Sequence, residues 1–489
     1  MIRPGRNRAR FALASLAVAS GCVHGPPRIE GVAAAPPTQT TQWTPPASVT
    51  EAAARDVVRP GRIDTIKQYT LAEAIDIALR NSPLTRQSWA QARAAADVYG
   101  SNQGRWYPTI TAGVALNRSL ALTSPGRPAG ERTQYGPSGS LSYSVFDFGG
   151  RTGAIDVARQ TAIAVDLTHN ATVQNTILLV ESSAFTYLST RAQRDAQKSS
   201  LDLASAALDA ANERHHVGLA TIADVLQART ARSQAELQLQ TLEGILLVTK
   251  GSLAVSMGLP ANTPFDVPAV TLSDSVHFIL ESVDSLIDVA VRNRPELASA
   301  RAQAAAAHSQ IKVARSGYLP SMALQVTGAN NASNISTFAG NTYSLNLGVS
   351  VPVFSGFSNQ YDVAAANEQY QAAQARTELT RQQIIQQVFT AYYTLRTATD
   401  RVRTSRDLLA SAIQSEEVAR GRYKEGVGSI VDLLVAQSAL ATARSQDVDS
   451  RWQWRSALAQ LAHDVGVLNS RGDASFSPFT PAADIRPKQ

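Results

Sequence analysis

Residues Arg422 to Leu434 read RYKEGVGSIVDLL, and 208 residues earlier Arg214 to Leu226 read RHHVGLATIADVL. Arg, Gly, Ile, Asp and Leu occupy matching places in the two copies. Gly218 and Gly426 are the shared glycines, and glycine adopts the left-handed backbone that commonly ends a helix. Each copy is therefore predicted to be a turn between two helices.

Long helices are predicted to precede both turns. No Gly or Pro occurs from Ala154 to Val217, and none occurs from Phe357 to Arg420, just before Gly421. A helix of such length would be about 96 Å long at 1.5 Å per residue, which exceeds both an ordinary globular helix and the thickness of a bilayer. The stretches Ile222 to Glu243 and Ile430 to Val465 then run back, so each turn closes an antiparallel helical hairpin. The first return helix is expected to end around Gly258 and Pro260.

Apolar residues recur every seven positions along these helices. The positions are Val173, Val180 and Tyr187, then Leu201 and Leu208, and in the second half Val388, Leu395, Val402 and Leu409. Seven-residue spacing is typical of a coiled-coil seam. A helix lying on a globular core could show it too, but helices this long extend beyond any core that the chain could supply.

Four shorter segments alternate apolar with small or polar residues, which is the pattern of β-strands. Their apolar positions are Ile110, Ala112, Val114 and Leu116; Leu141, Tyr143 and Val145; Met322, Leu324 and Val326; and Tyr343, Leu345, Leu347, Val349 and Val351. A Gly- and Pro-rich loop from Ser119 to Pro137 separates the first two. Each segment is about as long as a tilted strand that crosses an outer membrane.

The two halves of the chain repeat one plan. Ala78 to Pro83 (ALRNSP) matches Ala290 to Pro295 (AVRNRP), and the same offset of 212 carries Tyr107-Pro108 onto Leu319-Pro320. The unit is helix, strand, strand, long helix, turn and helix, so the chain is predicted to be a tandem duplication. We place the first repeat at residues 69–260, a connector at 261–283, the second repeat at 284–467 and a tail at 468–489. The first repeat is expected to open with a helix from Tyr69 to Arg105, with Thr70 as its N-cap.

The first 21 residues have the features of an export signal. Basic residues precede an apolar run from Phe11 to Ala19, and small residues lead to Cys22, the single cysteine. This placement resembles a bacterial lipoprotein cleavage site, so we expect residues 1–21 to be removed and Cys22 to be acylated. The alternative is ordinary cleavage after Ala17 to Ala19. Residues 22–68 are then a lipidated Pro-rich linker, extended from Val23 to about Arg62.

Composition and motifs argue against an enzyme or a nucleic-acid-binding protein. The net charge is +6, but four arginines of the first 21 residues supply most of it, so nucleic acid is not expected as a partner. No nucleophile motif, phosphate-binding loop or metal-ligand spacing is present, and no cofactor is expected. His215 and His216 are adjacent, but adjacent helical residues point in different directions.

The strands also restrict the assembly. Four strands cannot close a barrel, and open strand edges are not tolerated in lipid, so closure needs other copies of the chain. Three copies would give twelve strands, an even number within the known range. Two would give eight, a barrel whose interior is filled by side chains. A conduit therefore favours a homotrimer.

The duplicated unit, the Tyr-Pro and Leu-Pro entries to the strands, and Val217-Gly218-Leu219 followed by Ile222, Asp224 and Val225 resemble the TolC family of outer-membrane efflux channels. The resemblance covers about residues 69–467. It implies a membrane α+β fold, in which a trimeric 12-stranded β-barrel with four strands per chain continues as a long α-helical coiled-coil barrel through the periplasm. The lipid on Cys22 would place the chain in the lipid-anchored branch, held in the bacterial outer membrane.

The resemblance also assigns roles to the turns. It implies an exit channel of a tripartite efflux system that passively conducts drugs or other small solutes, with a periplasmic adaptor protein and an inner-membrane efflux pump as partners. The two turns would form the adaptor-docking rim, made by Val217, Gly218, Leu219, Gly426 and Val427. In that family, residues after the second turn close the periplasmic entrance, and Tyr423 and Asp432 match members of this gate.

The gate cannot be transferred in full. Gly428 stands where a family member has a basic residue, and Val435 stands where it has a second acid. What remains is one Asp432 per protomer, which threefold symmetry would gather into a ring of carboxylates that favours cations. The alternative is that Asp432 stabilises the first turn of the helix that starts near Ser429. Asp224 has the same spacing at the first turn and is expected to face outward.

Two other functions fit the same architecture less closely. One is the exit duct of type I protein secretion, which uses the same family fold. The other is a structural coiled-coil protein of the envelope without a pore. Four strands with apolar outer faces oppose the second alternative, because a spacer does not need them.

Overall fold

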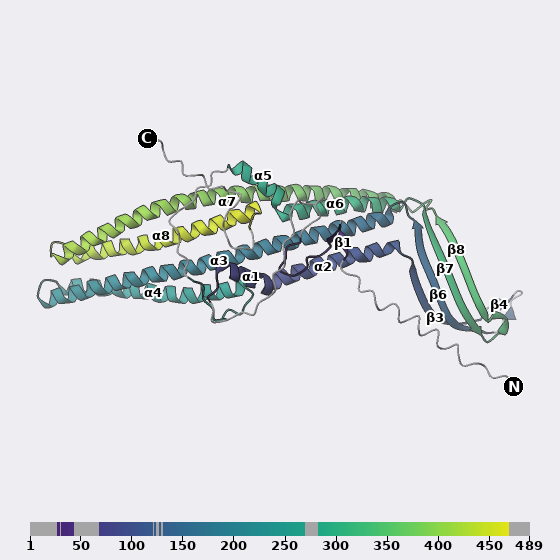
Figure 1. Cartoon of the computed structure of the whole chain (residues 1–489), viewed down its shortest axis with the longest axis horizontal. Coiled ribbons are helices and arrows are strands. Elements are labelled where there is room, and N and C mark those ends of the chain that lie inside the picture. The colour runs from purple at the N-terminus through teal and green to yellow at the C-terminus, as the bar shows by residue number, and fades with distance from the viewer. Residues whose placement is uncertain are drawn as a thin grey trace, which may run out of the picture.

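The computed structural model describes residues 27–29, 31–43, 68–120, 122–123, 127–128, 131–268 and 282–468. The signal region, Cys22, most of the connector and nearly all of the predicted tail lie outside these residues. The molecule is elongated, with two long helical hairpins at one end and a sheet that bends away at the other (Figure 1). No helix in the described part of the chain is both long and apolar enough to cross a lipid bilayer.

Each half of the chain contains two short helices, two long strands, a long helix and a return helix. In the first half these are α1 (Leu71–Asn81), α2 (Pro83–Gln103), β3 (Thr109–Ser119), β6 (Arg132–Phe146), α3 (Gly150–His216) and α4 (Ile222–Ser256). In the second half they are α5 (Val283–Asn293), α6 (Pro295–Ser316), β7 (Ser321–Ser333), β8 (Gly340–Ser350), α7 (Ser358–Lys424) and α8 (Ile430–Val465). α3 and α7 both have 67 residues, which confirms the predicted tandem duplication.

Short elements complete the chain. They are β1 (Arg28–Ile29) paired with β2 (Val32–Ala33), β4 (Leu122–Thr123) paired with β5 (Arg127–Pro128), and two single-turn helices at Gly104–Trp106 and Ser336–Phe338.

Several predicted helix boundaries were wrong. The expected helix from Tyr69 to Arg105 is broken at Ser82, whose backbone is extended because Pro83 follows it. Thr70 is the N-cap, as predicted, and forms a capping box with Glu73. The last helical turn of α7 contains Gly421, since a single glycine costs a helix only about 1 kcal/mol.

Of the remaining boundaries, two agree with the prediction and one does not. α4 ends at Ser256, and Gly258 with φ +74° follows it, so the first return helix ends where it was predicted to end. β6 begins at Arg132, inside the segment predicted to be loop, because it pairs there with residues of β3. The return helix of the second half has its predicted bounds, Ile430 to Val465.

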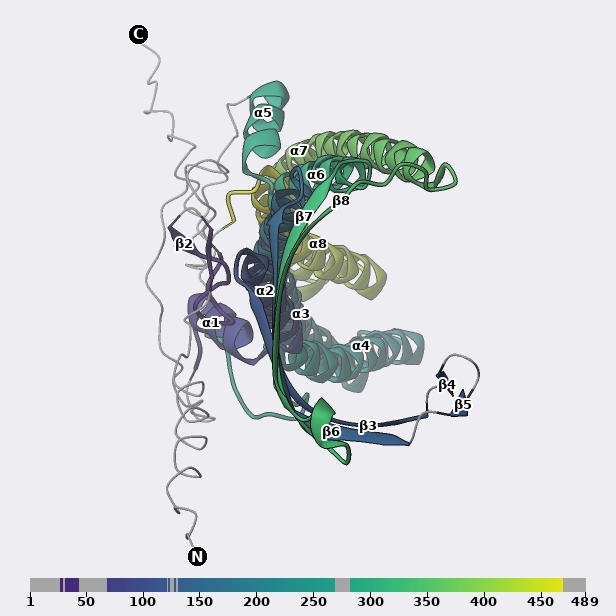
Figure 2. The same cartoon turned by 90° about the vertical axis from the view of Figure 1, so that its right-hand side faces the viewer.

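The four long strands form one antiparallel sheet in the order β3-β6-β7-β8. Ile110 pairs with Leu141 across β3 and β6, and Leu324 of β7 pairs with Tyr143 on one side and Leu347 on the other. The sheet is strongly curved (Figure 2). Its outer strands β3 and β8 each have one neighbour, so the described strands of one chain form an arc and not a closed barrel.

The predicted coiled-coil seams are buried. Val173, Val180 and Tyr187 of α3 belong to an apolar cluster with residues of α1 and α4. Val388, Leu395 and Val402 of α7 are likewise buried, the first two in a cluster with residues of α5 and α8. Nearer the hairpin ends the predicted positions Leu201, Leu208 and Leu409 are only half-buried, and alanines of α3 take the buried positions. Small residues there let the two hairpins approach closely.

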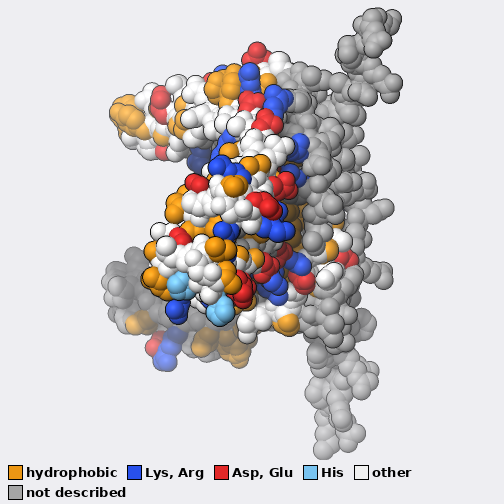
Figure 3. Space-filling view, turned by 90° about the vertical axis from the view of Figure 1, so that its left-hand side faces the viewer, with side chains coloured by type: hydrophobic (Ala, Val, Ile, Leu, Met, Phe, Trp, Pro, Cys, Tyr) orange, Lys and Arg blue, Asp and Glu red, His pale blue; other side chains and the backbone are white. Residues whose placement is uncertain are grey.

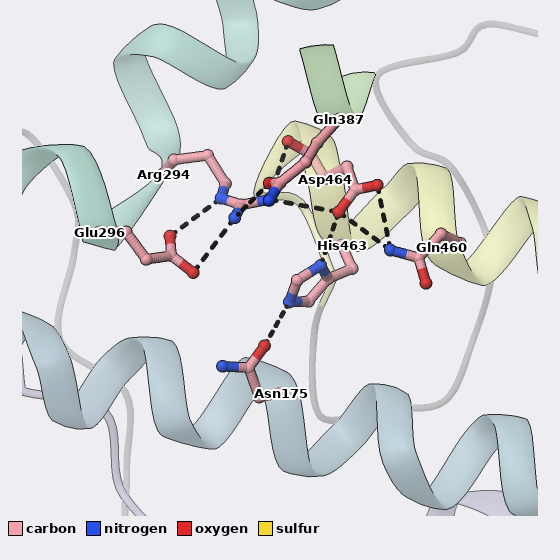
Figure 4. A network of polar contacts seen from close by, with 7 residues as sticks. All are labelled: Asn175, Arg294, Glu296, Gln387, Gln460, His463 and Asp464. Carbon is pink, nitrogen blue, oxygen red and sulfur yellow. Dashed lines mark hydrogen bonds and ion pairs between the residues drawn. The ribbon is translucent and has the colours of Figure 1, made fainter. Parts of the chain in front are cut away.

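A polar network ties the two halves together at the middle of the molecule (Figure 4). Arg294, just before α6, donates to Glu296 (2.9 Å), to Gln387 of α7 (3.0 Å) and to Asp464 of α8 (3.3 Å). His463 contacts Asp464 (2.9 Å) through Nδ1 and Asn175 of α3 (2.8 Å) through Nε2. Arg294 and Asp464 are both buried, and each has a second partner in the network, Glu296 for Arg294 and His463 for Asp464.

Part of the predicted linker is folded. Residues 27–29 and 31–43 pack on α2 and α3, burying Ile29, Ala34 and Trp43, so an extended linker is the wrong description of this segment. Asn170 of α3 accepts from the Trp43 amide and donates to the Trp43 carbonyl, both at 2.6 Å. Pro-rich segments lack periodicity, so their docking is decided by a surface that forms only when the helices assemble.

One buried acid in α3 has no partner. Asp166 is inaccessible to solvent, and neither of its carboxylate oxygens has a hydrogen-bond partner among the described residues. Burial raises the pKa of Asp166 to about 9. The folded protein therefore holds this group protonated at pH values where the unfolded chain ionises it.

We expect Asp166→Asn to be more stable than the wild type at pH 8 and equally stable near pH 4. A carboxyl whose pKa is raised by folding lowers stability as pH rises from the unfolded value to the folded one, by about 1.4 kcal/mol per pH unit. Thermal unfolding of the detergent-solubilised protein across this range measures the effect. Asp209→Asn, at an exposed acid of the same helix, is the control and should show no such trend. A pH-independent difference would contradict the assignment.

Candidate functional site: the hairpin tips

The two hairpins end in turns of the same construction, as predicted. Gly218 and Gly426 have φ values of +76° and +79°, in the left-handed region that favours glycine. The amide of Gly218 donates to the carbonyl of His215 (3.0 Å), and the amide of Gly426 donates to the carbonyl of Tyr423 (3.1 Å). These bonds satisfy carbonyls that the end of a helix leaves free.

Apolar side chains project from both tips. Leu219 is 70% exposed and Val427 69%, and Val217 is also mostly exposed. Figure 3 looks onto this end of the molecule, where histidine side chains lie on the tip of the lower hairpin, α3–α4. Exposed apolar residues at the tips of polar hairpins indicate an interaction surface.

The two predicted acids of the tips both stabilise a helix start. Asp432 accepts from the Ser429 amide (3.3 Å), and the Asp432 amide donates to the Ser429 hydroxyl (3.1 Å). Asp224 forms the same capping box with Thr221 at the other tip. The hydrogen bonds from Ser429 lower the pKa of Asp432 below its ordinary value. Asp432 therefore has the capping role that we gave as the alternative, and its carboxylate remains exposed.

Tyr423 has different surroundings from Asp432. It is buried at the end of α7, in an apolar cluster with Ala207 and Ala211 of α3 and with Ile430 of α8. Its hydroxyl has no hydrogen-bond partner among the described residues, and burial raises the pKa of Tyr423. Among the described residues the two predicted gate residues thus share no hydrogen bond; Tyr423 instead joins the second hairpin to the first.

Arg214 is a residue of this site that sequence reasoning missed. Its Nη1 donates to the carbonyl of Tyr423, and its guanidinium lies over the Tyr423 ring with Cζ 4.9 Å from the centroid. Its Nη2 lies 3.3 Å from the place where a side chain on Gly426 would begin. The available signal was its position as the first residue of the repeated stretch, where Arg422 is its counterpart.

The adjacent histidines diverge. His215 contacts the carbonyl of Ala220 through Nδ1 (3.0 Å), while His216 is exposed. Within the described ranges no group of three or more His, Cys, Asp or Glu side chains is placed to hold a metal ion.

A family model and several known proteins match this chain in sequence. The family model of outer membrane efflux proteins matches residues 74–259 and 286–467. CyaE of Bordetella pertussis is 29% identical over 88% of this chain and 92% of its own. The probable efflux pump outer membrane protein SepC of Pseudomonas putida is 25% identical over 84% and 85%. TolC of Vibrio cholerae is 24% identical over 82% and 91%.

Solved structures share the fold. The outer membrane protein VceC of Vibrio cholerae superposes with a TM-score of 0.72 at 20% identity, covering 81% of this chain and 96% of its own. The outer membrane channel CmeC of Campylobacter jejuni gives 0.73 at 16%, covering 83% and 88%. The family match spans both repeats, from α1 to the end of α8. The chain therefore belongs to the outer membrane efflux protein family.

Proposed function

We propose that this protein is the exit channel of a tripartite efflux system: a homotrimer that passively conducts small solutes from an inner-membrane pump through the periplasm and outer membrane. The observation that carries the proposal is the four-stranded arc, whose apolar residues such as Ile110 and Tyr343 are exposed and whose edges β3 and β8 are unpaired in one chain. Three arcs close a twelve-stranded barrel. Efflux is favoured over protein secretion because relatives such as SepC are named as efflux pump proteins.

The proposed adaptor site is the pair of tips. Leu219 and Val427 are exposed and lie on turns whose geometry is fixed by Gly218 and Gly426. An apolar surface at the far end from the sheet is suited to a periplasmic partner. No catalytic role is proposed, because a passive conduit needs only a continuous passage and a docked pump.

We expect the double variant Leu219→Asp, Val427→Asp to abolish drug efflux in cells while the purified protein still conducts ions in planar bilayers. Charges at these side chains oppose docking to an apolar partner but disturb little packing within the chain, since both residues are mostly exposed. Substitutions at Leu219 and Val427 test docking better than substitutions of Gly218 or Gly426, because any side chain at the glycines would strain a left-handed backbone. The neutral pair Leu219→Met, Val427→Ile is the control. Absence of conductance from the wild type would overturn the channel; normal efflux by the double variant would overturn the docking site.

We also propose that Asp432 acts on ions near the periplasmic entrance in addition to capping α8. Its carboxylate is exposed, and a threefold axis would gather three copies. Tyr423 is proposed to keep the entrance narrow by holding the two hairpins of a protomer together.

Asp432→Asn should reduce the cation preference of the closed channel, whereas Asp224→Asn should not. Asparagine removes the charge but keeps an oxygen that accepts the Ser429 amide, so the capping bond survives. Reversal potentials in a salt gradient measure the preference. Asp432→Ala removes both the charge and the capping bond, so its difference from Asp432→Asn measures the effect of losing the cap on ion preference. If Asp432→Asn behaves as wild type while Asp432→Ala does not, the acid serves its helix alone.

Acylation of Cys22 is proposed as well. Pro27 contacts the last turns of α2, where its Cγ lies 3.2 Å from the place of a side chain on Gly100. This point is close to the start of β3 at Thr109. Cys22 and Pro27 are five positions apart in the chain, a separation that can span about 17 Å, so a lipid on Cys22 can reach the membrane beside the sheet.

Labelled palmitate should enter the wild type but not Cys22→Ser, and the variant should still fractionate with the outer membrane. One acyl chain gives only marginal binding, so the sheet is expected to supply most of the anchoring. Label in the variant would refute acylation at this residue, and release of the variant into the soluble fraction would refute the lesser role of the lipid.

A further inference from the structure

The contact made by Arg214 occurs at only one of two equivalent places in a single chain. Arg214 ends the first hairpin and donates to the Tyr423 carbonyl of the second. The duplication makes Arg422 the counterpart of Arg214, and it makes His215 the counterpart of Tyr423. Arg422 is exposed and makes no hydrogen bond among the described residues through its guanidinium. Its charge acts on the nearby Asp432 of the same chain, but no hydrogen bond within the described residues occupies the guanidinium, so the donor of the second contact is present and accessible.

The acceptor of the second contact is present too. The carbonyls of His215 and Tyr423 accept equivalent bonds from the glycine amides of their turns, but among the described residues only the Tyr423 carbonyl also accepts from an arginine. A side chain on Gly426 would meet Arg214 at 3.3 Å, whereas one on Gly218 would meet nothing within 4 Å. The turn at Gly218 thus has the same backbone as the turn at Gly426, but the place that Arg214 fills beside Gly426 is open beside Gly218.

Apolar packing shows the same asymmetry. Ile430, at the start of α8, is 3% exposed because α3 of the first hairpin covers it, whereas its counterpart Ile222, at the start of α4, is 58% exposed. Within the chain α3 packs on α8, which leaves α4 and α7 as the two outer edges of the helical layer. A neighbouring copy that presents α7 to α4 would cover Ile222 as α3 covers Ile430.

We propose that Arg422 of one protomer donates to the carbonyl oxygen of His215 in the next protomer, repeating between chains the contact that Arg214 makes within a chain. The inference rests on the proposed trimer. It requires that the rotation relating the first hairpin to the second within a chain also relates the second hairpin to the first hairpin of the next protomer. Such an interface is head-to-tail, and it closes into a ring.

The chemistry suits arginine in particular. The carbonyl of His215 lies in the last turn of α3, where the helix dipole favours a positive charge and late carbonyls accept bonds from basic side chains. A guanidinium presents several donors in one plane, so it can bond the carbonyl and lie over the adjacent ring at the same time. The result is a ring of alternating links, Arg214 within and Arg422 between protomers, at the periplasmic end.

Cysteines at positions 215 and 422 test the contact directly. In a Cys22→Ser background, His215→Cys with Arg422→Cys should yield covalent dimers and trimers on denaturing gels after treatment with a short bis-methanethiosulfonate linker. A linker is needed because an arginine side chain separates the two backbones beyond the range of a disulfide. The matched pair Arg214→Cys with Tyr423→Cys should react within one chain and stay monomeric.

Glutaraldehyde treatment of the same membranes reports the trimer independently of the cysteines. Trimers with glutaraldehyde but only monomers with the thiol linker would overturn the Arg422 contact and leave the channel proposal intact. Absence of trimers with glutaraldehyde would overturn both. As a second readout, Arg422→Ala should lower the temperature at which the trimer dissociates in detergent, and His215→Tyr, which copies the second tip, should raise it. An unchanged dissociation temperature in both variants would count against the contact.

Discussion

The packing of α3 against α8 is the contact on which the rest of the structure depends. A helix of 67 residues extends far beyond the core that one hairpin supplies, so each long helix needs support along its length. Near the middle Asn175 meets His463 at 2.8 Å, and farther on the rings of Phe185 and Trp452 lie 5.9 Å apart. At the tip Arg214 of α3 reaches the second hairpin through Tyr423, at the end of α7. The two repeats are therefore in contact at several positions along α3, and these contacts hold the two tips side by side at the same end of the molecule.

The duplicated halves keep the same backbone contacts while their side chains have diverged. Gly258 and Gly466, with φ values of +74° and +79°, each follow a return helix and press on the bend between the two short helices of their repeat. A side chain on Gly258 would begin 2.7 Å from that bend, and one on Gly466 3.2 Å from the equivalent bend. The bends themselves differ, since Ser82 in the first half is replaced by the buried Arg294 network in the second. The close backbone contacts at these glycines are thus common to both repeats, while the side chains at the bends differ between them.

The sequence was most informative where the signal is local. The turns at Gly218 and Gly426, the seven-residue seams and the four strands depend on glycine chemistry or on short periods, and the structure confirms them. Docking of residues 27–43 could not be predicted, because it depends on a surface formed jointly by α2 and α3. The role of Arg214 was hidden for a related reason: its partner Tyr423 is 209 residues away. The spacing around Asp432 allowed a cap and a pore charge equally, and only the capping bonds are visible in one chain.

The edges of a single chain explain why membrane insertion and assembly must be coupled. The outer edges of β3 and β8 are unpaired among the described strands, and an unpaired backbone group in lipid costs several kcal/mol, so an isolated arc is unstable in the bilayer. The helical layer ends in α4 and α7, which leave Leu237 and Val418 exposed to water. The two kinds of edge thus need neighbours for opposite reasons, one to hide polar groups from lipid and the other to hide apolar groups from water. Because each repeat contributes two strands and one hairpin, the same rotation about a common axis satisfies both.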